Sequence, residues 1–260
     1  MEKNISEKPE SILTIKGLSR FFGGVKAVSN LDCEVAVHDI TAMIGPNGAG
    51  KTTAFNLISG ILPVSQGEIV FDNNTITNLP PYKIASLGIA RTFQNIRIFS
   101  NMSVLENVMV GVHTRSRKGM FASAFRLPGV NREERYIYEE AMKQLQFTGI
   151  DHLAHRNAGN LAFGQQRILE IARALASHPK LVLFDEPAAG LNSQETIKLG
   201  ELIRSIRESG VTVFIVEHDM ELVMNISDSV IVLNNGLLVT NGTPSEVQRN
   251  REVIAAYLGD

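Results

Sequence analysis

A glycine-rich segment at residues 45–52 limits the folds open to this chain more than any other feature. It reads Gly-Pro-Asn-Gly-Ala-Gly-Lys-Thr and matches G-x-x-x-x-G-K-[ST], the pattern of a phosphate-binding loop. The apolar run at residues 40–44 predicts a buried strand before it, and residues 53–59 predict a helix after it. Strand, glycine loop and helix form the setting in which this pattern binds phosphate. A chance glycine-rich turn followed by Lys-Thr is the alternative.

The residue types in this loop suit the binding of a phosphate chain. Glycines let the backbone close around phosphate oxygens, and the amides at the start of a helix point at the anion. Lys51 can reach the β- and γ-phosphates, and the Thr52 hydroxyl can bind Mg²⁺. We expect the phosphate-binding residues to be Gly45, Pro46, Asn47, Gly48, Ala49, Gly50, Lys51, Thr52 and Thr53.

Length and composition describe a globular chain. Its 260 residues allow one large domain, or one domain with an inserted lobe, and 44% hydrophobic residues suffice for a sizeable core. The net charge of −2 gives no general attraction to nucleic acid or anionic lipid. The single cysteine, Cys33, excludes a disulfide framework and fits a reducing compartment. We expect a small apolar residue in a strand there, with a reactive thiol as the alternative.

The sequence predicts no segment that enters a membrane. The first 11 residues are charged and lack the apolar region of a signal peptide. No stretch approaches the roughly 20 apolar residues that a spanning helix needs. We therefore expect the chain to be soluble by itself, so that any role at a membrane comes through a partner.

Strands and helices alternate along most of the chain, which predicts an α/β fold with a mostly parallel, doubly wound core sheet. Apolar runs predict strands at residues 12–15, 31–37, 40–44, 67–71, 89–94, 180–187 and 211–216. Helical spacing of apolar residues predicts helices at 53–59, 82–87, 165–176, 193–209 and 220–226, and Thr243 caps a last helix. Residues 234–236, Asn-Asn-Gly, predict a hairpin.

The character of the sequence changes at residue 95 and predicts an inserted helical lobe. Helices are expected at 103–112, with Ser103 as N-cap and Glu106 three residues later, and at 132–147. Residues 113–131 between them mix basic and apolar side chains, which indicates a solvated loop or, alternatively, a membrane-facing contact. We expect one domain over 1–260, with its core at 12–94 and 160–260 and the lobe at 95–159.

Polar side chains end the strands that are expected to share an edge with the phosphate loop. Asp185 ends an apolar strand, where a carboxylate holds Mg²⁺, and Glu186 can polarise a water as general base. A solvated acidic pair is the alternative. Gln94 can orient that water or touch the metal, and His218 can contact the γ-phosphate unless it is an ordinary surface histidine. Phe22, just before a glycine turn, can stack on a purine or fill the core.

The order of these motifs resembles that of the ATP-binding subunits of ABC transporters, over nearly the whole chain. Between Gln94 and the acidic strand end lies a stretch in the position of the family's signature, namely Leu161, Ala162, Phe163, Gly164 and Gln165. Within that family the chain is similar to the LivG-type subunit of high-affinity branched-chain amino acid importers. The stretches that carry this similarity are 91–94, 103–107, 160–166 and 254–259.

The resemblance implies a P-loop NTPase of the ABC type, with a mostly parallel core sheet, an antiparallel β subdomain and an inserted α-helical lobe. It implies ATP and Mg²⁺ as ligands. Phe22 would stack on the base, Lys51 would contact phosphate and act in catalysis, Glu186 would be the base and His218 would contact the γ-phosphate. Mg²⁺ would be held by Thr52, Gln94 and Asp185.

The resemblance also implies partners. Two cassettes would pair head to tail, with ATP between the phosphate loop of one and the signature of the other. The pair would drive two transmembrane permease subunits at the cytoplasmic face of the inner membrane. A periplasmic or lipoprotein substrate-binding protein would take part indirectly, and no nucleic acid is expected.

Two departures from the family pattern bear on the partner. The usual signature is Leu-Ser-Gly-Gly-Gln, whereas this chain has Ala162 and Phe163 at its second and third positions. The loop after Glu186 carries Asn192 where the family usually has Asp. The half of the site that binds this chain's own ATP looks complete, and the half offered to the partner looks altered. We therefore expect a heterodimer with unequal sites, while the sequence leaves a homodimer open.

Other functions remain alternatives at this stage. Urea or an amide for import, and a lipid or lipopolysaccharide for export, are alternative cargoes, because the cargo pocket lies in other chains. A soluble ABC-type ATPase acting on ribosomes or DNA usually carries two cassettes or a long coiled coil, and this sequence has one cassette and no heptad run. A purely regulatory nucleotide-binding module is disfavoured by Glu186.

Overall fold

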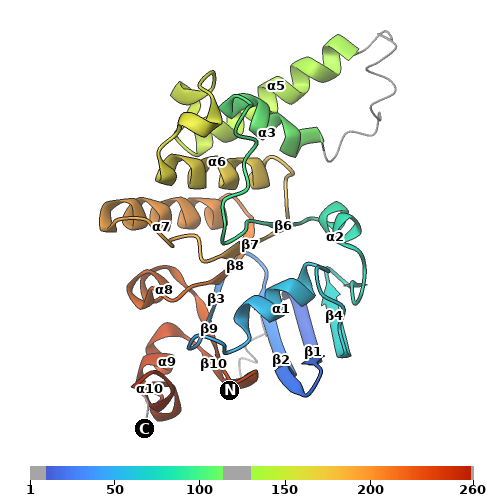
Figure 1. Ribbon diagram of the computed structural model, residues 1–260, viewed down its shortest axis with the longest axis vertical. Helices are drawn as coiled ribbons and strands as arrows, with labels where there is room; N and C mark the ends of the chain where they lie inside the picture. Colours follow the sequence, from blue (N-terminus) through green and yellow to red (C-terminus); the bar gives the residue numbers. More distant parts are fainter. Residues whose placement is uncertain (1–9, 114–129, 259–260) are drawn as a thin grey trace, which may run out of the picture.

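A six-stranded sheet forms the centre of the molecule in the computed structural model, which describes residues 10–113 and 130–258 (Figure 1). Its strand order is β10-β9-β3-β8-β7-β6, and all neighbours are parallel except the β9–β10 hairpin. β3, β7 and β8 are buried at every position, as expected for parallel strands covered on both faces. The strands are β3 (Ile40–Ile44), β6 (Ile89–Arg91), β7 (Leu181–Asp185), β8 (Thr212–Val216), β9 (Ser229–Asn234) and β10 (Leu237–Gly242).

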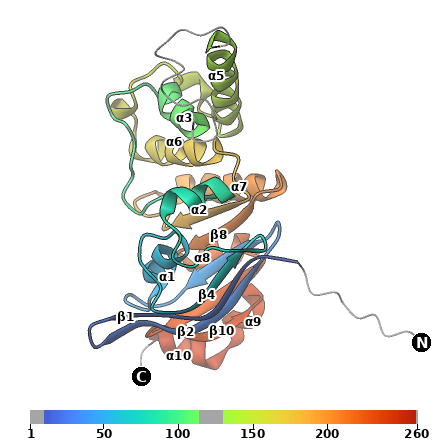
Figure 2. The same ribbon diagram turned by 90° about the vertical axis from the view of Figure 1, so that its right-hand side faces the viewer.

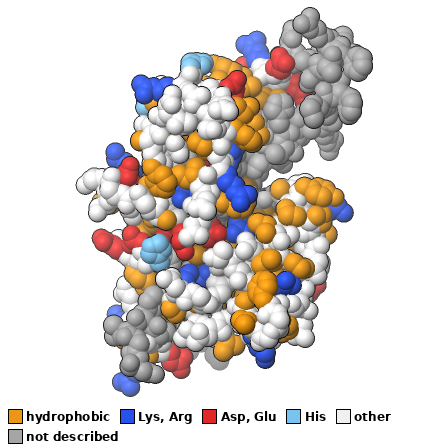
Figure 3. All heavy atoms as spheres, viewed as in Figure 1, with side chains coloured by type: hydrophobic (Ala, Val, Ile, Leu, Met, Phe, Trp, Pro, Cys, Tyr) orange, Lys and Arg blue, Asp and Glu red, His pale blue; other side chains and the backbone are white. Residues whose placement is uncertain are grey.

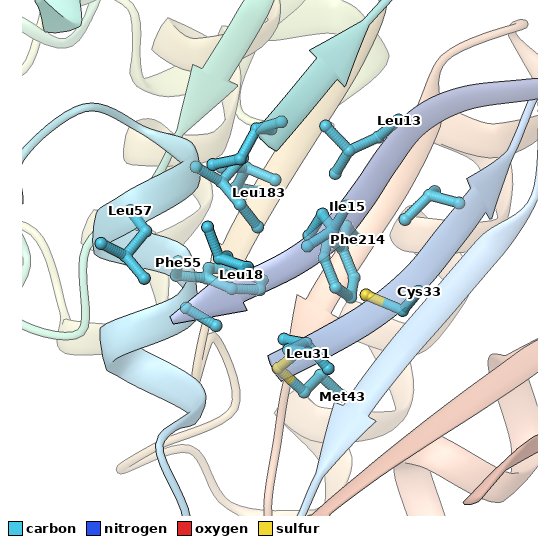
Figure 4. Close-up of a cluster of buried hydrophobic side chains, with 14 of the residues drawn as sticks. Leu13, Ile15, Leu18, Leu31, Cys33, Met43, Phe55, Leu57, Leu183 and Phe214 are labelled. Carbon is cyan, nitrogen blue, oxygen red and sulfur yellow. The ribbon is translucent and has the colours of Figure 1, made fainter. Parts of the chain in front are cut away.

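A second, antiparallel sheet packs against one face of the central sheet. Its order is β2-β1-β4-β5, with β1 at Ser11–Phe22, β2 at Val25–Ala36, β4 at Gln66–Phe71 and β5 at Asn74–Thr75. Side chains from both sheets and from helix α1 (Lys51–Ile58) form one hydrophobic cluster between them (Figure 4). The helix that follows the phosphate loop is therefore fixed between two sheets.

Helices cover the other face of the central sheet and build a lobe at one end. A second cluster joins the sheet to α7 (Ser193–Glu208), α8 (Met220–Ile226), α9 (Pro244–Arg249) and α10 (Arg251–Leu258). A third cluster holds together α3 (Val104–His113), α5 (Val130–Phe147) and α6 (Phe163–Leu175) as a helical lobe above the sheets (Figure 2). Helix α6 contributes Leu169 to the lobe and Ile171 to the cluster under the sheet, so it connects the two bodies.

These observations confirm the expected fold class, but the predicted ends of several strands were wrong. The strand predicted at 31–37 begins earlier, at Val25, and the strand predicted at 180–187 spans only Leu181–Asp185. The strand predicted at 12–15 runs on to Phe22, because the left-handed Gly17 (φ 57°) lets the β1–β2 pairing shift register and continue. The strand predicted at 89–94 ends at Arg91, because the amides of Phe93 and Arg97 bind a side chain instead of a neighbouring strand. The segment expected to be a basic, apolar loop lies almost wholly outside the described residues.

Three local signals in the sequence are confirmed by hydrogen bonds. Ser103 and Glu106 exchange bonds with each other's amides at the start of α3, the reciprocal pattern of a capping box. Thr243 caps α9, which has Pro244 at its first position. The predicted hairpin at 234–236 closes β9 onto β10.

Cys33 lies within the buried cluster between the sheets, with its sulfur among apolar side chains (Figure 4). Burial raises the pKa of this thiol to about 12, and the nearby carboxylates of Asp32 and Glu34 add to the shift. The sulfur is therefore a protonated, inaccessible thiol at neutral pH, as the apolar interpretation of Cys33 expects.

We predict that the native chain does not react with a thiol reagent such as Ellman's reagent at pH 8. Since the thiolate is the reactive form, both its scarcity and its burial oppose the reaction. The same sample in concentrated guanidinium chloride should release one equivalent of chromophore, which serves as the control. Full reaction of the folded chain within minutes would contradict this placement of Cys33.

Candidate functional site

The strand order of the central sheet brings four loops together at one edge. β3, β8, β7 and β6 are consecutive neighbours, and all four are parallel. The phosphate loop follows β3, His218 follows β8, Glu186 follows β7 and Gln94 follows β6. The carboxyl ends of parallel strands are where α/β sheets bind ligands, so this edge is the candidate site.

The phosphate loop is a close-fitting turn in which glycine is required. A Cβ at Gly45 would lie 2.1 Å from the Leu233 carbonyl oxygen. A Cβ at Gly50, a left-handed residue with φ 103°, would lie 2.5 Å from the Ala27 carbonyl oxygen. The backbone is thus wedged between β9 and β2, and α1 begins directly after it without a side-chain cap, which leaves its first amides available to an anion.

Lys51 opens α1 and turns its side chain back to the loop. Its Nζ donates to the carbonyl oxygens of Gly45 at 2.7 Å and Pro46 at 3.0 Å, and the residue is buried. Burial lowers the pKa of this ammonium, while Glu186 and Asp185 act to raise it. A cation held between the loop and two carboxylates is placed to bind a phosphate group.

Asp185 ends β7 as half of a buried ion pair. Its Oδ2 accepts from Arg91 Nη2 at 2.8 Å, and the two side chains are only 7% and 4% exposed. Arg91 also donates to the Ser59 hydroxyl at 2.6 Å, which ties the end of β6 to the end of α1. Asp185 Oδ1 is buried and has no hydrogen-bond partner among the described residues. An orphaned carboxylate oxygen beside the phosphate loop fits a site for a divalent cation and its water shell.

Glu186 lies at the centre of the site in a strained backbone conformation, with φ 48°. Its amide bonds the Val216 carbonyl of β8, which fixes the residue to the neighbouring strand. Its Oε2 accepts from Gln94 Nε2 at 2.8 Å and lies 3.9 Å from His218 Nδ1. Two side chains predicted from separate strand ends, Gln94 and His218, therefore converge on the carboxylate at the end of a third strand.

The loop that carries Gln94 is held by a buried ion pair on α6. Arg167 Nη1 bonds Glu170 Oε2 at 3.0 Å, and the two side chains are 0% and 2% exposed. Arg167 also donates to the carbonyls of Phe93 and Gln94, and Glu170 accepts from the amides of Phe93 and Arg97. Sequence reasoning missed both residues, because they sit within an ordinary helical pattern.

Phe22 and the signature stretch lie apart from this cluster. Phe22 ends β1 at the tip of the β1–β2 hairpin, 42% exposed, with the Arg20 guanidinium 4.6 Å from its ring centre. Leu161 and Ala162 precede α6, and Phe163, Gly164 and Gln165 begin it; Phe163 is 48% exposed. No hydrogen bond within the described chain joins these residues to the phosphate loop.

The signature residues form an incomplete helix cap. Gln165 Oε1 accepts from the Ala162 amide at 3.2 Å, but Ala162 has no side-chain oxygen to complete a capping box. A Cβ on Gly190 would lie 2.9 Å from Phe163 Cε1, so the ring lies directly over Gly190 in the loop after Glu186. Asn192 caps α7 and accepts from the Glu195 amide, a role the sequence analysis missed.

We predict that Arg91→Met lowers the free energy of unfolding by about 3–5 kcal/mol, because it leaves the Asp185 carboxylate buried without its partner. Arg135→Met is the matched control, since Arg135 pairs with Glu139 on the surface of α5 and such pairs contribute at most ~1 kcal/mol. Urea unfolding followed by circular dichroism measures both. Equal effects of the two substitutions would show that the buried pair has no special weight.

Over residues 10–113 and 130–258, none of the helices combines the length and the apolar character that a bilayer crossing demands.

Comparison with known families and proteins gives consistent matches. A family profile described as ABC transporter matches residues 28–189, and one described as branched-chain amino acid ATP-binding cassette transporter matches residues 238–260. The high-affinity branched-chain amino acid transport ATP-binding protein BraF of Pseudomonas aeruginosa is 45% identical over 250 residues, which cover 96% of this chain and 98% of that protein. LivG of Escherichia coli, with the same description, is 42% identical over 252 residues, covering 96% and 99%.

Solved structures agree with these relatives. A nucleotide-free ATP-binding cassette from an ABC transporter superposes with a TM-score of 0.83 at 33% identity, covering 96% of this chain and all of that one. The ADP conformation of an ATP-binding cassette of an ABC transporter gives a TM-score of 0.84 at 33% identity, covering 96% and 99%.

Proposed function

The chain belongs to the family of ABC transporter ATP-binding subunits and is an ATP-hydrolysing enzyme, and from this premise we propose that it powers the uptake of branched-chain amino acids through partner membrane permeases. The observation that best supports this cargo is the full-length similarity to BraF and LivG, both described as branched-chain amino acid transport ATP-binding proteins. The match of residues 238–260 to the branched-chain cassette profile supports it independently, because this segment lies outside the general ABC match.

The geometry of the edge supports a division of roles in ATP hydrolysis. The phosphate loop and Lys51 bind the phosphate chain, and Phe22 stacks on the base from the tip of the hairpin. Thr52, Gln94 and Asp185 would hold Mg²⁺, for which the orphaned Asp185 Oδ1 is the best-fitting ligand. When bound, Mg²⁺ neutralises charge on the phosphates. The remaining chemistry falls to side chains on the strand ends.

Glu186 is the general base in this proposal. Its carboxylate takes the proton of a water that attacks the γ-phosphate, and Gln94, already bonded to it at 2.8 Å, orients that water. His218, 3.9 Å from the same carboxylate, contacts the γ-phosphate. A carboxylate held by neighbours from the two flanking strands, β6 and β8, is preorganised, which reduces the cost of reaching the reactive geometry.

We predict that Glu186→Gln lowers the turnover of ATP by about 10²–10⁴-fold while ATP still binds, since the amide cannot accept the proton. ATPase assays measure turnover, and a fluorescent ATP analogue measures binding. Glu208→Gln, an exposed change in the last turn of α7, is the control and should leave both unchanged. Normal turnover in the Glu186 variant would remove it as the base.

The partner subunit is inferred from the altered signature. Ala162 has no hydroxyl to bond a γ-phosphate across a head-to-tail interface, and such a bond to a charged group contributes about 1.5–3 kcal/mol. The Phe163 ring occupies the surface where the family usually has glycine. These features support a heterodimer, in which the partner's signature completes this chain's ATP site and this chain's signature serves the partner less well.

We predict that the purified chain alone has low ATPase turnover and that adding the neighbouring cassette subunit raises it about tenfold or more, the factor that a bond of about 1.5 kcal/mol represents. Turnover measured against the concentration of each subunit separates the two cases. Full activity that saturates with self-association of this chain alone would favour a homodimer.

A groove between the core and the lobe supports the docking of a permease. It is a cavity of about 590 Å³, lined by residues of α2 (Pro81–Leu87), α3, α6 and the loop after β6. Its lining is mostly apolar, and Ile61, Tyr82 and Phe99 lie exposed in or beside it. Apolar side chains gather over α2 in the space-filling view (Figure 3). Because the Gln94 loop forms one wall, a segment bound here would act directly on the site.

The transporter assembled with its two permeases tests the proposed cargo. We expect ATP-dependent uptake of leucine, isoleucine and valine into proteoliposomes supplied with the substrate-binding protein, with the cassettes on the outer, cytoplasmic-equivalent face. The same assembly carrying Glu186→Gln is the matched control and should not accumulate label. Preferential uptake of urea or a short amide, or export of a lipid, would replace the cargo while leaving the ATPase intact.

A further inference from the structure

Glu217 is a buried carboxylate at the candidate site to which the proposed mechanism gives no role. It follows β8, directly before His218, and its side chain is fully buried. Burial raises the pKa of this carboxyl, and three backbone amides that bond it oppose the shift. An ionisable group that loses its hydration needs specific partners, so the identity of these partners shows what the residue holds in place.

The two oxygens of Glu217 bind two different loops. Oε1 accepts from the Ala188 amide at 2.7 Å, in the loop that follows Glu186. Oε2 accepts from the amide of His218 at 3.0 Å and from that of Asp219 at 3.4 Å, in the loop that follows β8. One rigid carboxylate therefore spans the segment carrying Glu186 and the segment carrying His218.

The loop on the Oε1 side is itself a compact unit. Ala189 donates to the Glu186 carbonyl at 3.2 Å, and Leu191 donates to the Ala188 carbonyl at 3.0 Å, so two successive turns run from Glu186 to Leu191. Phe163 of the signature lies over Gly190 within these turns. A displacement of the signature would therefore move this loop. Among the hydrogen bonds of the described residues, Glu217 provides the only side-chain acceptor for the Ala188 amide.

We propose that Glu217 is a positioning residue that couples the loop at 186–191, and through it the signature stretch, to His218. The inference rests on the function proposed above for Glu186 and His218. In this arrangement, a shift of Phe163 caused by a partner cassette changes the position of His218, the proposed γ-phosphate contact of the same chain. The coupling needs two acceptor oxygens on one side chain, which among the amino acids only a carboxylate provides.

The isosteric variant Glu217→Gln separates coupling from simple burial. An amide has one acceptor oxygen, so it can serve the Ala188 amide or the His218 and Asp219 amides, but not both loops. We expect hydrogen exchange, followed by NMR on the full chain, to accelerate at one of the two loops and stay slow at the other. We also expect kcat for ATP, measured with the partner cassette, to fall about 10–100-fold with ATP affinity within about twofold, as for residues that orient a site.

Asp228→Asn is the matched control. Asp228 also binds a backbone amide, that of Ile40 at 2.8 Å, but through a single oxygen, which asparagine retains. It should change neither exchange nor turnover. Slow exchange at both loops in Glu217→Gln, together with normal kcat, would overturn the coupling. The expected exchange pattern with normal kcat would support the coupling and count against the catalytic roles proposed for Glu186 and His218.

A second variant keeps the test valid if Glu217→Gln fails to fold. Phe163→Ala removes an exposed ring, so the fold should tolerate it. If the loops are coupled, loosening of the turns at 186–191 should accelerate exchange at both Ala188 and His218. Acceleration at Ala188 alone, or at neither amide, would overturn the proposal.

Discussion

The parallel pairing of β3, β8, β7 and β6 is the constraint on which the candidate site depends. β3, β7 and β8 are short and buried on both faces, so none of the three can slide without exposing apolar side chains. Their carboxyl ends are therefore fixed relative to one another, and loops separated by more than 100 residues in sequence meet at one edge. The hydrophobic clusters on the two faces supply the rigidity, and the loops at the edge supply the chemistry.

Buried charges then fix the loops to this frame. Arg91 holds Asp185, the Arg167–Glu170 pair holds the Gln94 loop, and Glu217 holds two loops at once. Buried ion pairs are poor devices for stability alone, because desolvation offsets much of their attraction. Here these groups instead fix the geometry of the loops. The loops must stay irregular to reach a ligand, so strand and helix hydrogen bonds cannot hold them, and guanidinium and carboxylate groups hold their backbone.

The sequence predicted what depends on local pattern and missed what depends on distant partners. The phosphate loop, the strand ends at Asp185 and Glu186 and the hairpin at 234–236 are each encoded within a few residues, and these predictions of structure are confirmed. Arg91 and Asp185 are 94 residues apart, and no local sequence pattern around either residue indicates that the two pair. The strand predicted through Gln94 was wrong at its end for the same reason, since the Glu170 carboxylate accepts from the Phe93 amide, which a neighbouring strand would otherwise have bonded.

The altered signature gains a physical meaning from its surroundings. Ala162 and Phe163 replace the family's Ser and Gly, which removes a polar contact and adds a large ring. The ring packs against Gly190. Gly190 has φ 82°, and a Cβ there would collide with the ring, so phenylalanine at 163 and glycine at 190 fit each other. The signature of this chain thus rests on the loop that follows Glu186 in the same chain, which is the contact that the proposed coupling requires.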